Sequence, residues 1–204
     1  FYTRPRIVEH LDAGARQTVS RLLSGLIIER QPRVLDLMAA VSSHLPPDRG
    51  YAEVTGLGLN AEELAANRQL DRRIVHDLNE QPVLPFEDGA FDVVLNTVSI
   101  QYVTSPDRLF EEVGRILKPG GLFVVIFSNR TFPTKAVKLW ELLADDERLR
   151  LLQRFFRTAG MFKSSQTFIQ MGDPRPADDK YHSMGIPSDP VFAAMPGTVT
   201  HINR

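Results

Sequence analysis

Hydrophobic residues recur along this chain in two patterns, one with helical spacing and one in short continuous runs. Over residues 6–29 apolar positions recur every three or four residues, with Arg16, Arg21 and Glu29 outside the stripe, which predicts an amphipathic opening helix. Five short apolar and β-branched runs predict strands at residues 33–38, 52–59, 73–77, 91–97 and 122–127. Such runs are typical of parallel strands that helices cover on both faces.

The remaining elements follow from turn signals. Ser105 and Pro106 open a segment with one apolar face, which predicts a helix capped by Ser105 and ended by the Pro-Gly-Gly of residues 119–121. After residue 133 the helical spacing pauses at Asp145 and Asp146, so we expect two helices there. Residues 166–171 and 191–195 predict two closing strands, separated by a loop rich in Pro and Gly.

Composition narrows the class of protein. The chain has 204 residues, of which 43% are hydrophobic and 24% charged, the balance of a soluble globular domain. A net charge of −1 provides no basic field for nucleic acid, and the absence of cysteine excludes thiolate catalysis and disulfides. No apolar run approaches the roughly 18 residues that span a bilayer. We therefore expect a soluble, cytoplasmic protein, and a targeting segment before Phe1 would leave no trace in this sequence.

Two sequence blocks carry a resemblance to a known family. They are Leu-Pro-Phe-Glu-Asp-Gly-Ala-Phe-Asp-Val-Val at residues 84–94 and Arg-Ile-Leu-Lys-Pro-Gly-Gly at residues 115–121. With the strands around them, they resemble the type 11 domain of class I S-adenosylmethionine-dependent methyltransferases, over residues 34–129. The resemblance implies an α/β, Rossmann-like seven-stranded sheet, with five parallel strands, a C-terminal antiparallel pair and helices on both faces. It also implies S-adenosylmethionine as cofactor.

We expect one methyltransferase-like domain over residues 1–204. Residues 1–30 are its N-terminal helical cap, residues 33–130 its cofactor-type core, and residues 131–204 its later helices and closing strand pair. The closing pair also distinguishes the chain from a nicotinamide-binding Rossmann domain, which would continue with a further strand–helix–strand unit. A nicotinamide-dependent oxidoreductase is therefore disfavoured.

The first predicted strand departs from the family pattern where the cofactor should lie. Asp36 matches the family's acidic residue, but Met38, Ala40 and Ser42 occupy its three glycine positions, and glycine is what permits positive φ angles and close approach of a ligand. Pro46-Pro47 should limit the following helix to about one turn. This loop is similar to that of a smaller, glycine-poor group of methyltransferase-like proteins, for which no substrate is implied.

The second departure lies at the second strand, where Gly58 replaces the family's ribose-binding carboxylate and Asn60 or Glu62 can substitute in part. Asp77 falls where the family's acidic side chain meets adenine. The cofactor residues implied by the resemblance are Asp36, Met38, Ala40, Ser42, Gly58, Leu59, Asn60, Asp77, Leu78, Asn96 and Thr97. The alternative is that residues 38–43 form an ordinary strand-to-helix connection, with Ser42 or Ser43 as N-cap, and bind nothing.

His44 and Tyr102 are the candidate catalytic residues. An imidazole beside the cofactor loop can act as a general base, and a phenol beyond the fourth strand can orient a nucleophile. Their alternatives are a helix-end or surface histidine and an aromatic ring that packs under the helix at Ser105. The five histidines show no metal-ligand spacing, so we expect no metal site. No Gly-x-Ser-x-Gly elbow or phosphate-binding Gly-Lys-Ser/Thr loop occurs.

These features favour methyl transfer from S-adenosylmethionine to a small-molecule substrate, driven mainly by proximity and alignment. The alternative is a catalytically silent domain that keeps the fold and serves as a binding or interaction module. Neither hypothesis calls for nucleic acid or a membrane as a partner, and the sequence assigns no oligomeric state.

Overall fold

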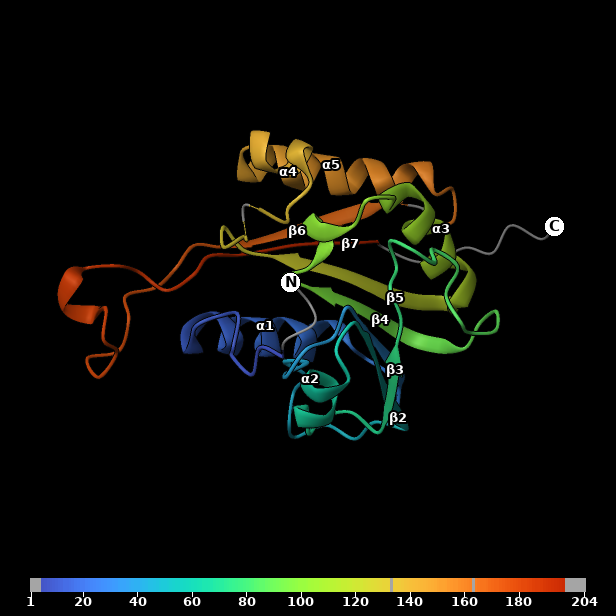
Figure 1. Cartoon of the computed structure of the whole chain (residues 1–204), viewed down its shortest axis with the longest axis horizontal. Helices are drawn as coiled ribbons and strands as arrows, with labels where there is room; N and C mark the ends of the chain where they lie inside the picture. The colour runs from blue at the N-terminus through green and yellow to red at the C-terminus, as the bar shows by residue number, and fades with distance from the viewer. Residues whose placement is uncertain (1–4, 133, 163, 197–204) are drawn as a thin grey trace.

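The computed structural model describes residues 5–132, 134–162 and 164–196, and its elements follow the predicted order (Figure 1). The strands of this part are β1 (Arg33–Leu37), β2 (Glu53–Gly58), β3 (Arg72–Val75), β4 (Phe91–Thr97), β5 (Leu117–Phe127), β6 (Ser165–Gln170) and β7 (Val191–Pro196). Its helices are α1 (Ala13–Leu26), α2 (Ala61–Ala66), α3 (Pro106–Ile116), α4 (Lys138–Leu142) and α5 (Asp145–Thr158), with short 3₁₀ turns η1 (Ile100–Tyr102) and η2 (His182–Met184).

The strands form one seven-stranded sheet in the order β3-β2-β1-β4-β5-β7-β6. β1 to β5 pair in parallel, whereas β7 runs antiparallel to both β5 and β6. The strand order reverses between β1 and β4, which is where an open α/β sheet leaves a crevice for ligands. The predicted sheet, with its antiparallel closing pair, is confirmed.

Helices cover both faces of the sheet, as the apolar runs predicted. α3, α4 and α5 lie on one face and α1 and α2 on the other (Figure 1). On the first face the rings of Phe110, Phe123 and Phe156 pack edge to face. The distances between their ring centroids are 4.8–5.4 Å. Burying each such ring contributes about 1.5–3 kcal/mol, so this cluster anchors α3 and α5 to the sheet.

Arg115 explains why the two blocks with family resemblance occur together. Its guanidinium donates to the carbonyl oxygens of Leu84 and Phe86 at 3.1 and 2.8 Å, and to the carboxylate of Asp88 at 2.8 Å. Glu112, one turn earlier in α3, accepts from Arg115 and from the Leu84 N–H. Residues 84–88 of the first block are therefore a turn before β4 that α3 holds in place.

Three local predictions are corrected by the structure. The opening helix begins at Ala13 rather than at residue 6, because the Asp12 side chain accepts from the Ala15 N–H and caps the helix there. Ser105 is the N-cap of α3 but makes no side-chain capping hydrogen bond. α3 ends at Ile116, before the Pro-Gly-Gly of residues 119–121, which instead lies within β5 where the pairing with β4 shifts register.

The connection from β1 to β2 also differs from the prediction. Instead of a shortened helix, residues 38–52 contain no helix at all. The loop is held by side chains that follow α2: Asn67 donates to the Ala40 carbonyl and to the Ser43 hydroxyl, and Gln69 accepts from the Ser43 N–H. Ser43 therefore caps no helix, and no helix N-terminus points at the crevice from this loop.

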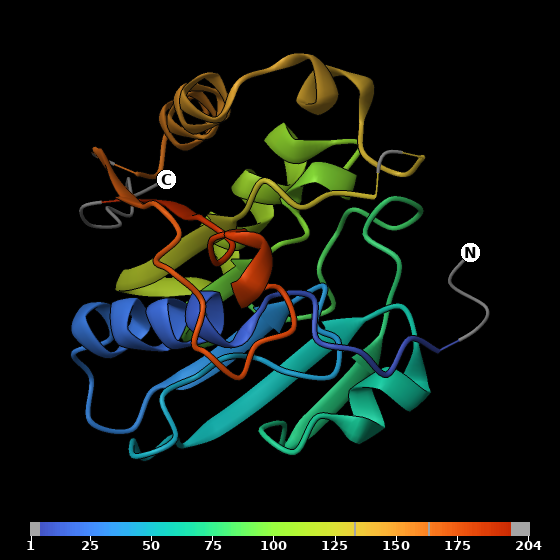
Figure 2. The same cartoon turned by 90° about the vertical axis from the view of Figure 1, so that its left-hand side faces the viewer.

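Between β6 and β7 the chain extends away from the sheet and returns past the start of α1 (Figures 1 and 2). Within this segment Arg175 is buried and pairs with Asp12 at 2.9 Å and Asp179 at 3.0 Å. The long loop is thereby fastened to the N-terminal side of α1. Within the described ranges, no helix combines the length and apolar content needed to cross a bilayer.

Candidate cofactor site

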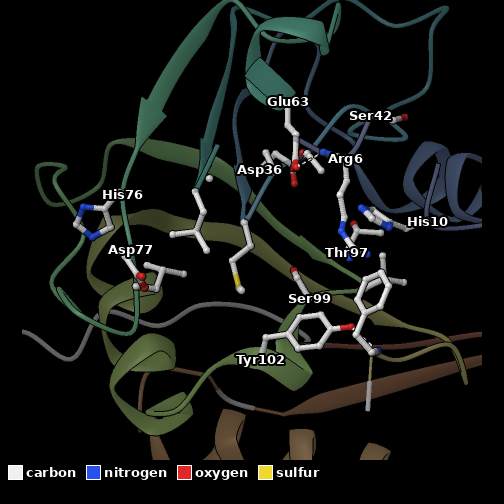
Figure 3. Close-up of a pocket in the computed structure, with 18 of the residues that line it drawn as sticks. Arg6, His10, Asp36, Ser42, Glu63, His76, Asp77, Thr97, Ser99 and Tyr102 are labelled. Carbon is white, nitrogen blue, oxygen red and sulfur yellow. Dashed lines mark hydrogen bonds between the residues drawn. The ribbon is translucent and has the colours of Figure 1, made fainter. Parts of the chain in front are cut away.

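A cavity of about 120 Å³ lies at the carboxyl ends of β1, β2 and β4, where the strand order reverses (Figure 3). Eleven of the thirteen residues predicted from the sequence line it. They are Asp36, Met38, Ala40, Ser42, His44, Gly58, Leu59, Asp77, Leu78, Thr97 and Tyr102. Small-molecule sites more commonly measure about 300–1,000 Å³, so this cavity is narrow.

The other two predicted residues lie elsewhere. The Asn60 side chain accepts from the N–H groups of Glu62 and Glu63 and caps α2. Asn96 is fully buried within β4 and donates to the Leu37 carbonyl at 3.5 Å. Neither residue is part of the cavity lining.

The loop after β1 takes a left-handed backbone without glycine. Met38 has φ 59° and His44 has φ 55°, and Val98, just beyond β4, has φ 47°. Among the described residues these are the three non-glycine residues with positive φ, and all three line the cavity. Each such conformation costs roughly 1–2 kcal/mol. Strain gathered in this way around one crevice is characteristic of functional sites.

Gly58 cannot be replaced by the family's carboxylate without moving this loop. A Cβ at Gly58 would lie 2.4 Å from the Ala39 carbonyl oxygen, a backbone atom. The Ala39 N–H donates to the Leu57 carbonyl at 2.9 Å, which fixes the loop on the end of β2. The glycine-poor loop and the missing acid therefore belong to one arrangement, in which the Ala39 backbone packs against Gly58.

Polar atoms without a protein partner surround the cavity. In the described structure Asp36 Oδ2, Thr97 Oγ1 and Ser99 Oγ are buried and accept or donate no hydrogen bond. Leaving such an atom unsatisfied costs about 1–3 kcal/mol. Burial raises the pKa of Asp36 to about 7, against a smaller opposing effect of a hydrogen bond with Ser43. These three atoms are the groups that a polar ligand would satisfy, so the lining suits the polar groups of a nucleoside or amino acid.

The two candidate catalytic residues differ in surroundings. Burial lowers the pKa of His44 to about 4, so its imidazole is neutral at neutral pH, and its Nδ1 lies 3.1 Å from the Ser42 hydroxyl. The Tyr102 hydroxyl accepts from the Phe132 N–H at 3.0 Å, and its ring lies beside the Phe132 ring. Tyr102 therefore both lines the cavity and packs against Phe132.

Several lining residues escaped the sequence analysis. Arg6 and His10 line the cavity because the chain before α1 is extended rather than helical. Glu63, not Glu62, faces it from the first turn of α2, and Phe132 closes it from beyond β5. Helical spacing at Arg6 misled the prediction, since only the cap at Asp12 marks the true start of α1. No signal in the sequence identified Phe132.

Among the described residues no group of three or more histidine, aspartate or glutamate side chains is arranged to hold a metal ion. Asp77 lines the cavity beyond β3, and its carboxylate accepts from the Asn79 N–H at 2.8 Å. The lining thus combines acidic, hydroxyl and aromatic side chains.

Comparison with known proteins agrees with this geometry. A methyltransferase-domain family model matches residues 38–125. The chain is 29% identical over 104 residues to the ubiquinone/menaquinone biosynthesis C-methyltransferase UbiE of Shewanella frigidimarina, covering 46% of this chain and 41% of that protein. The chain spans less than half the length of the curated relatives it matches.

Solved structures share the fold. A complex of the Trm112 methyltransferase activator and a methyltransferase from Haloferax volcanii superposes with a TM-score of 0.65 at 19% identity, covering 94% of this chain and 92% of that one. An S-adenosylmethionine-dependent methyltransferase from Thermotoga maritima gives a TM-score of 0.63 at 19% identity, covering 91% and 89%. S-adenosylmethionine is the cofactor of this family. Residues 38–125 therefore match a methyltransferase domain, and the sheet that contains them has the fold of these solved methyltransferases.

Proposed function

We propose that this chain transfers a methyl group from S-adenosylmethionine to a small-molecule acceptor at the cavity above β1, β2 and β4. The observation that carries the proposal is the set of buried, unpartnered polar atoms of Asp36, Thr97 and Ser99 at that cavity. Buried polar atoms are usually paired, and three of the eight unpartnered side-chain atoms among the described residues belong to this one lining, where a polar ligand would satisfy them. The strained backbone at Met38, His44 and Val98 supports the same conclusion, because it encircles the same space.

The lining residues have distinct roles in this proposal. Asp77 receives the adenine amino group, Glu63 takes over the ribose hydroxyls that a carboxylate at Gly58 would have bound, and Asp36 and Thr97 meet the amino-acid end. The bound cofactor supplies a methyl group on a sulfonium that is already activated. The protein therefore has mainly to align the acceptor with that group and exclude water.

Tyr102 and His44 are the residues we propose for the acceptor. The Tyr102 hydroxyl accepts from the Phe132 N–H, so its own O–H can donate to the acceptor and orient it. The neutral His44 imidazole can take a proton from the acceptor, although a pKa of about 4 makes it a weak base. This pairing suits an acceptor whose proton is lost readily.

A silent binding module is the second candidate, and the narrowness of the cavity favours it. Its volume of about 120 Å³ and the Ala39 carbonyl packed against Gly58 both restrict an adenosyl group. In that case the crevice would bind no cofactor, and the surface of the domain would bind a partner.

Ligand-dependent unfolding distinguishes the two. S-adenosylmethionine and S-adenosylhomocysteine at a hundredfold excess over Kd should each stabilise the protein by about 2.7 kcal/mol, and NAD should not. Thr97→Val and Ser99→Ala should reduce that stabilisation, since each removes one of the unpartnered hydroxyls. Transfer of a labelled methyl group to members of a small-molecule panel would then identify the acceptor. Absence of any shift with either adenosyl ligand at millimolar concentration would favour the silent module.

A further inference from the structure

The loop after β1 offers little to an anionic group. Helix N-termini bind carboxylates and phosphates because their N–H groups are unpaired and their dipole is positive. Here residues 38–52 form no helix, and Asn67 and Gln69 fasten the loop to the chain after α2. The loop therefore presents no helix N-terminus to a ligand carboxylate, and its residues that line the cavity carry no permanent positive charge.

Among the described residues that line the cavity, Arg6 is the single arginine or lysine. Burial lowers the pKa of both His10 and His44, so neither imidazole adds a positive charge at neutral pH. The carboxyl groups of Glu63 and Asp77 face the same space. Arg6 is thus the permanent positive charge of a lining that is otherwise neutral or acidic.

Contacts on two sides place Arg6 over the cavity. Its backbone N–H donates to Glu63 Oε1 at 2.7 Å, so the main chain rather than the guanidinium forms this tether. The guanidinium lies 5.0 Å from the centre of the Phe132 ring. Figure 3 shows the Arg6 side chain extending from beside Glu63 toward His10 and Thr97. Thr97 ends β4, so the charge lies near the strand ends where the polar atoms lack partners.

The other end of this N-terminal segment is fastened as well. The Asp12 N–H donates to the Asp189 carboxylate at 3.1 Å, and the Asp189 N–H donates to the Asp12 carboxylate at 2.7 Å. Arg175, itself buried, pairs with Asp12 at 2.9 Å. Residues 6–12 therefore form a segment held at both ends across the crevice, and its course fixes where the Arg6 side chain begins.

We propose that the Arg6 guanidinium binds the carboxylate at the amino-acid end of S-adenosylmethionine, replacing the helix N-terminus that the loop after β1 lacks. This inference rests on the proposed function. Arg6 would thus compensate for the glycine-poor loop. A side chain of the N-terminal segment would bind the carboxylate through charge-assisted hydrogen bonds.

A ligand-and-variant cycle tests this assignment by isothermal titration calorimetry. S-adenosylmethionine and its decarboxylated form differ only in the carboxylate, so the ratio of their Kd values reports on that group. We expect the wild type to prefer the carboxylated ligand by roughly 10- to 150-fold. Arg6→Met should abolish this preference by weakening S-adenosylmethionine alone, and Arg6→Lys should restore part of it. Arg21→Met, on α1 and outside the lining, should keep the wild-type ratio, because Arg21 bonds Thr18 within the same helix.

The outcomes separate this inference from the function on which it rests. Equal weakening of both ligands by Arg6→Met would overturn it, because Arg6 would then act by holding the segment in place. Unchanged Kd values for both ligands in Arg6→Met would also overturn it, because the guanidinium would then contribute nothing to binding of the carboxylate. If the wild type binds neither adenosyl ligand, the proposed function fails and this inference fails with it. Retention of the Arg6→Met fold is checked by its unfolding midpoint, since the Arg6–Glu63 tether is a backbone bond.

Discussion

Asp36 makes the stability of this protein depend on pH in a direction opposite to that of most carboxylates. Burial raises its pKa from the ordinary 3.8 to about 7, a shift of about three units. One unit corresponds to about 1.36 kcal/mol, so ionising this group in the folded state costs roughly 4 kcal/mol at pH well above 7. Because the folded state holds the proton more tightly than the unfolded state, stability falls as pH rises through the window between 3.8 and 7.

Asp36→Asn removes this titration and isolates it. The free energy of unfolding of the variant relative to wild type should rise by roughly 3 kcal/mol between pH 4.5 and pH 8, and urea unfolding at several pH values measures it. Asp48→Asn, an exposed site, is the matched control and should leave the wild-type pH profile unchanged. A difference that stays within about 0.5 kcal/mol over this range would refute the reasoning, because Asp36 would then be hydrated and the crevice wet.

Three further substitutions test the cavity and the hydrogen bonds by which Arg115 holds residues 84–88 against α3. Met38→Gly should tighten binding of S-adenosylhomocysteine in calorimetry because it widens the cavity, whereas Met38→Leu, which keeps the bulk, should not; equal affinities would remove Met38 as the obstacle. Gly58→Ala should lower the free energy of unfolding by about 1–3 kcal/mol without improving ligand binding, and an unchanged urea midpoint would contradict the packing of the loop on β2. Arg115→Met should lower the free energy of unfolding by about 1.5–3 kcal/mol, because the buried Glu112 carboxylate loses its charge-assisted hydrogen bonds with Arg115 and keeps the longer pair with Arg108 at 3.7 Å. The exposed Arg108→Met should cost less than about 1 kcal/mol, and similar losses for the two variants would show that Arg115 does not hold the turn before β4 in place.

Local chemistry misled the sequence analysis where tertiary contacts replaced it. The helical spacing begins at residue 6, but Ile7 and Val8 are 58% and 54% exposed and pack into no core. Their neighbours Arg6 and His10 line the cavity instead. Ser43 has the composition of a helix cap, yet Asn67 and Gln69, more than 20 residues later, determine its hydrogen bonds. Neither the course of the segment before α1 nor the hydrogen bonds of Ser43 can be recognised from periodicity in the sequence.

The sequence by itself determined the order of strands and helices, the parallel core with its antiparallel closing pair, and nearly all of the residues at the strand ends. Apolar runs and punctuation by Pro and Gly gave the order of the elements, because they are local properties that repeat along the chain. The antiparallel pairing and the residues at the strand ends were implied by the resemblance of residues 84–94 and 115–121 to a known family. Only the tertiary structure decided that the loop after β1 rests on Gly58, that Glu63 rather than Glu62 faces the cavity, and that Arg6 reaches it. Those outcomes depend on distances between residues far apart in sequence, and packing sets such distances rather than any nearby pattern.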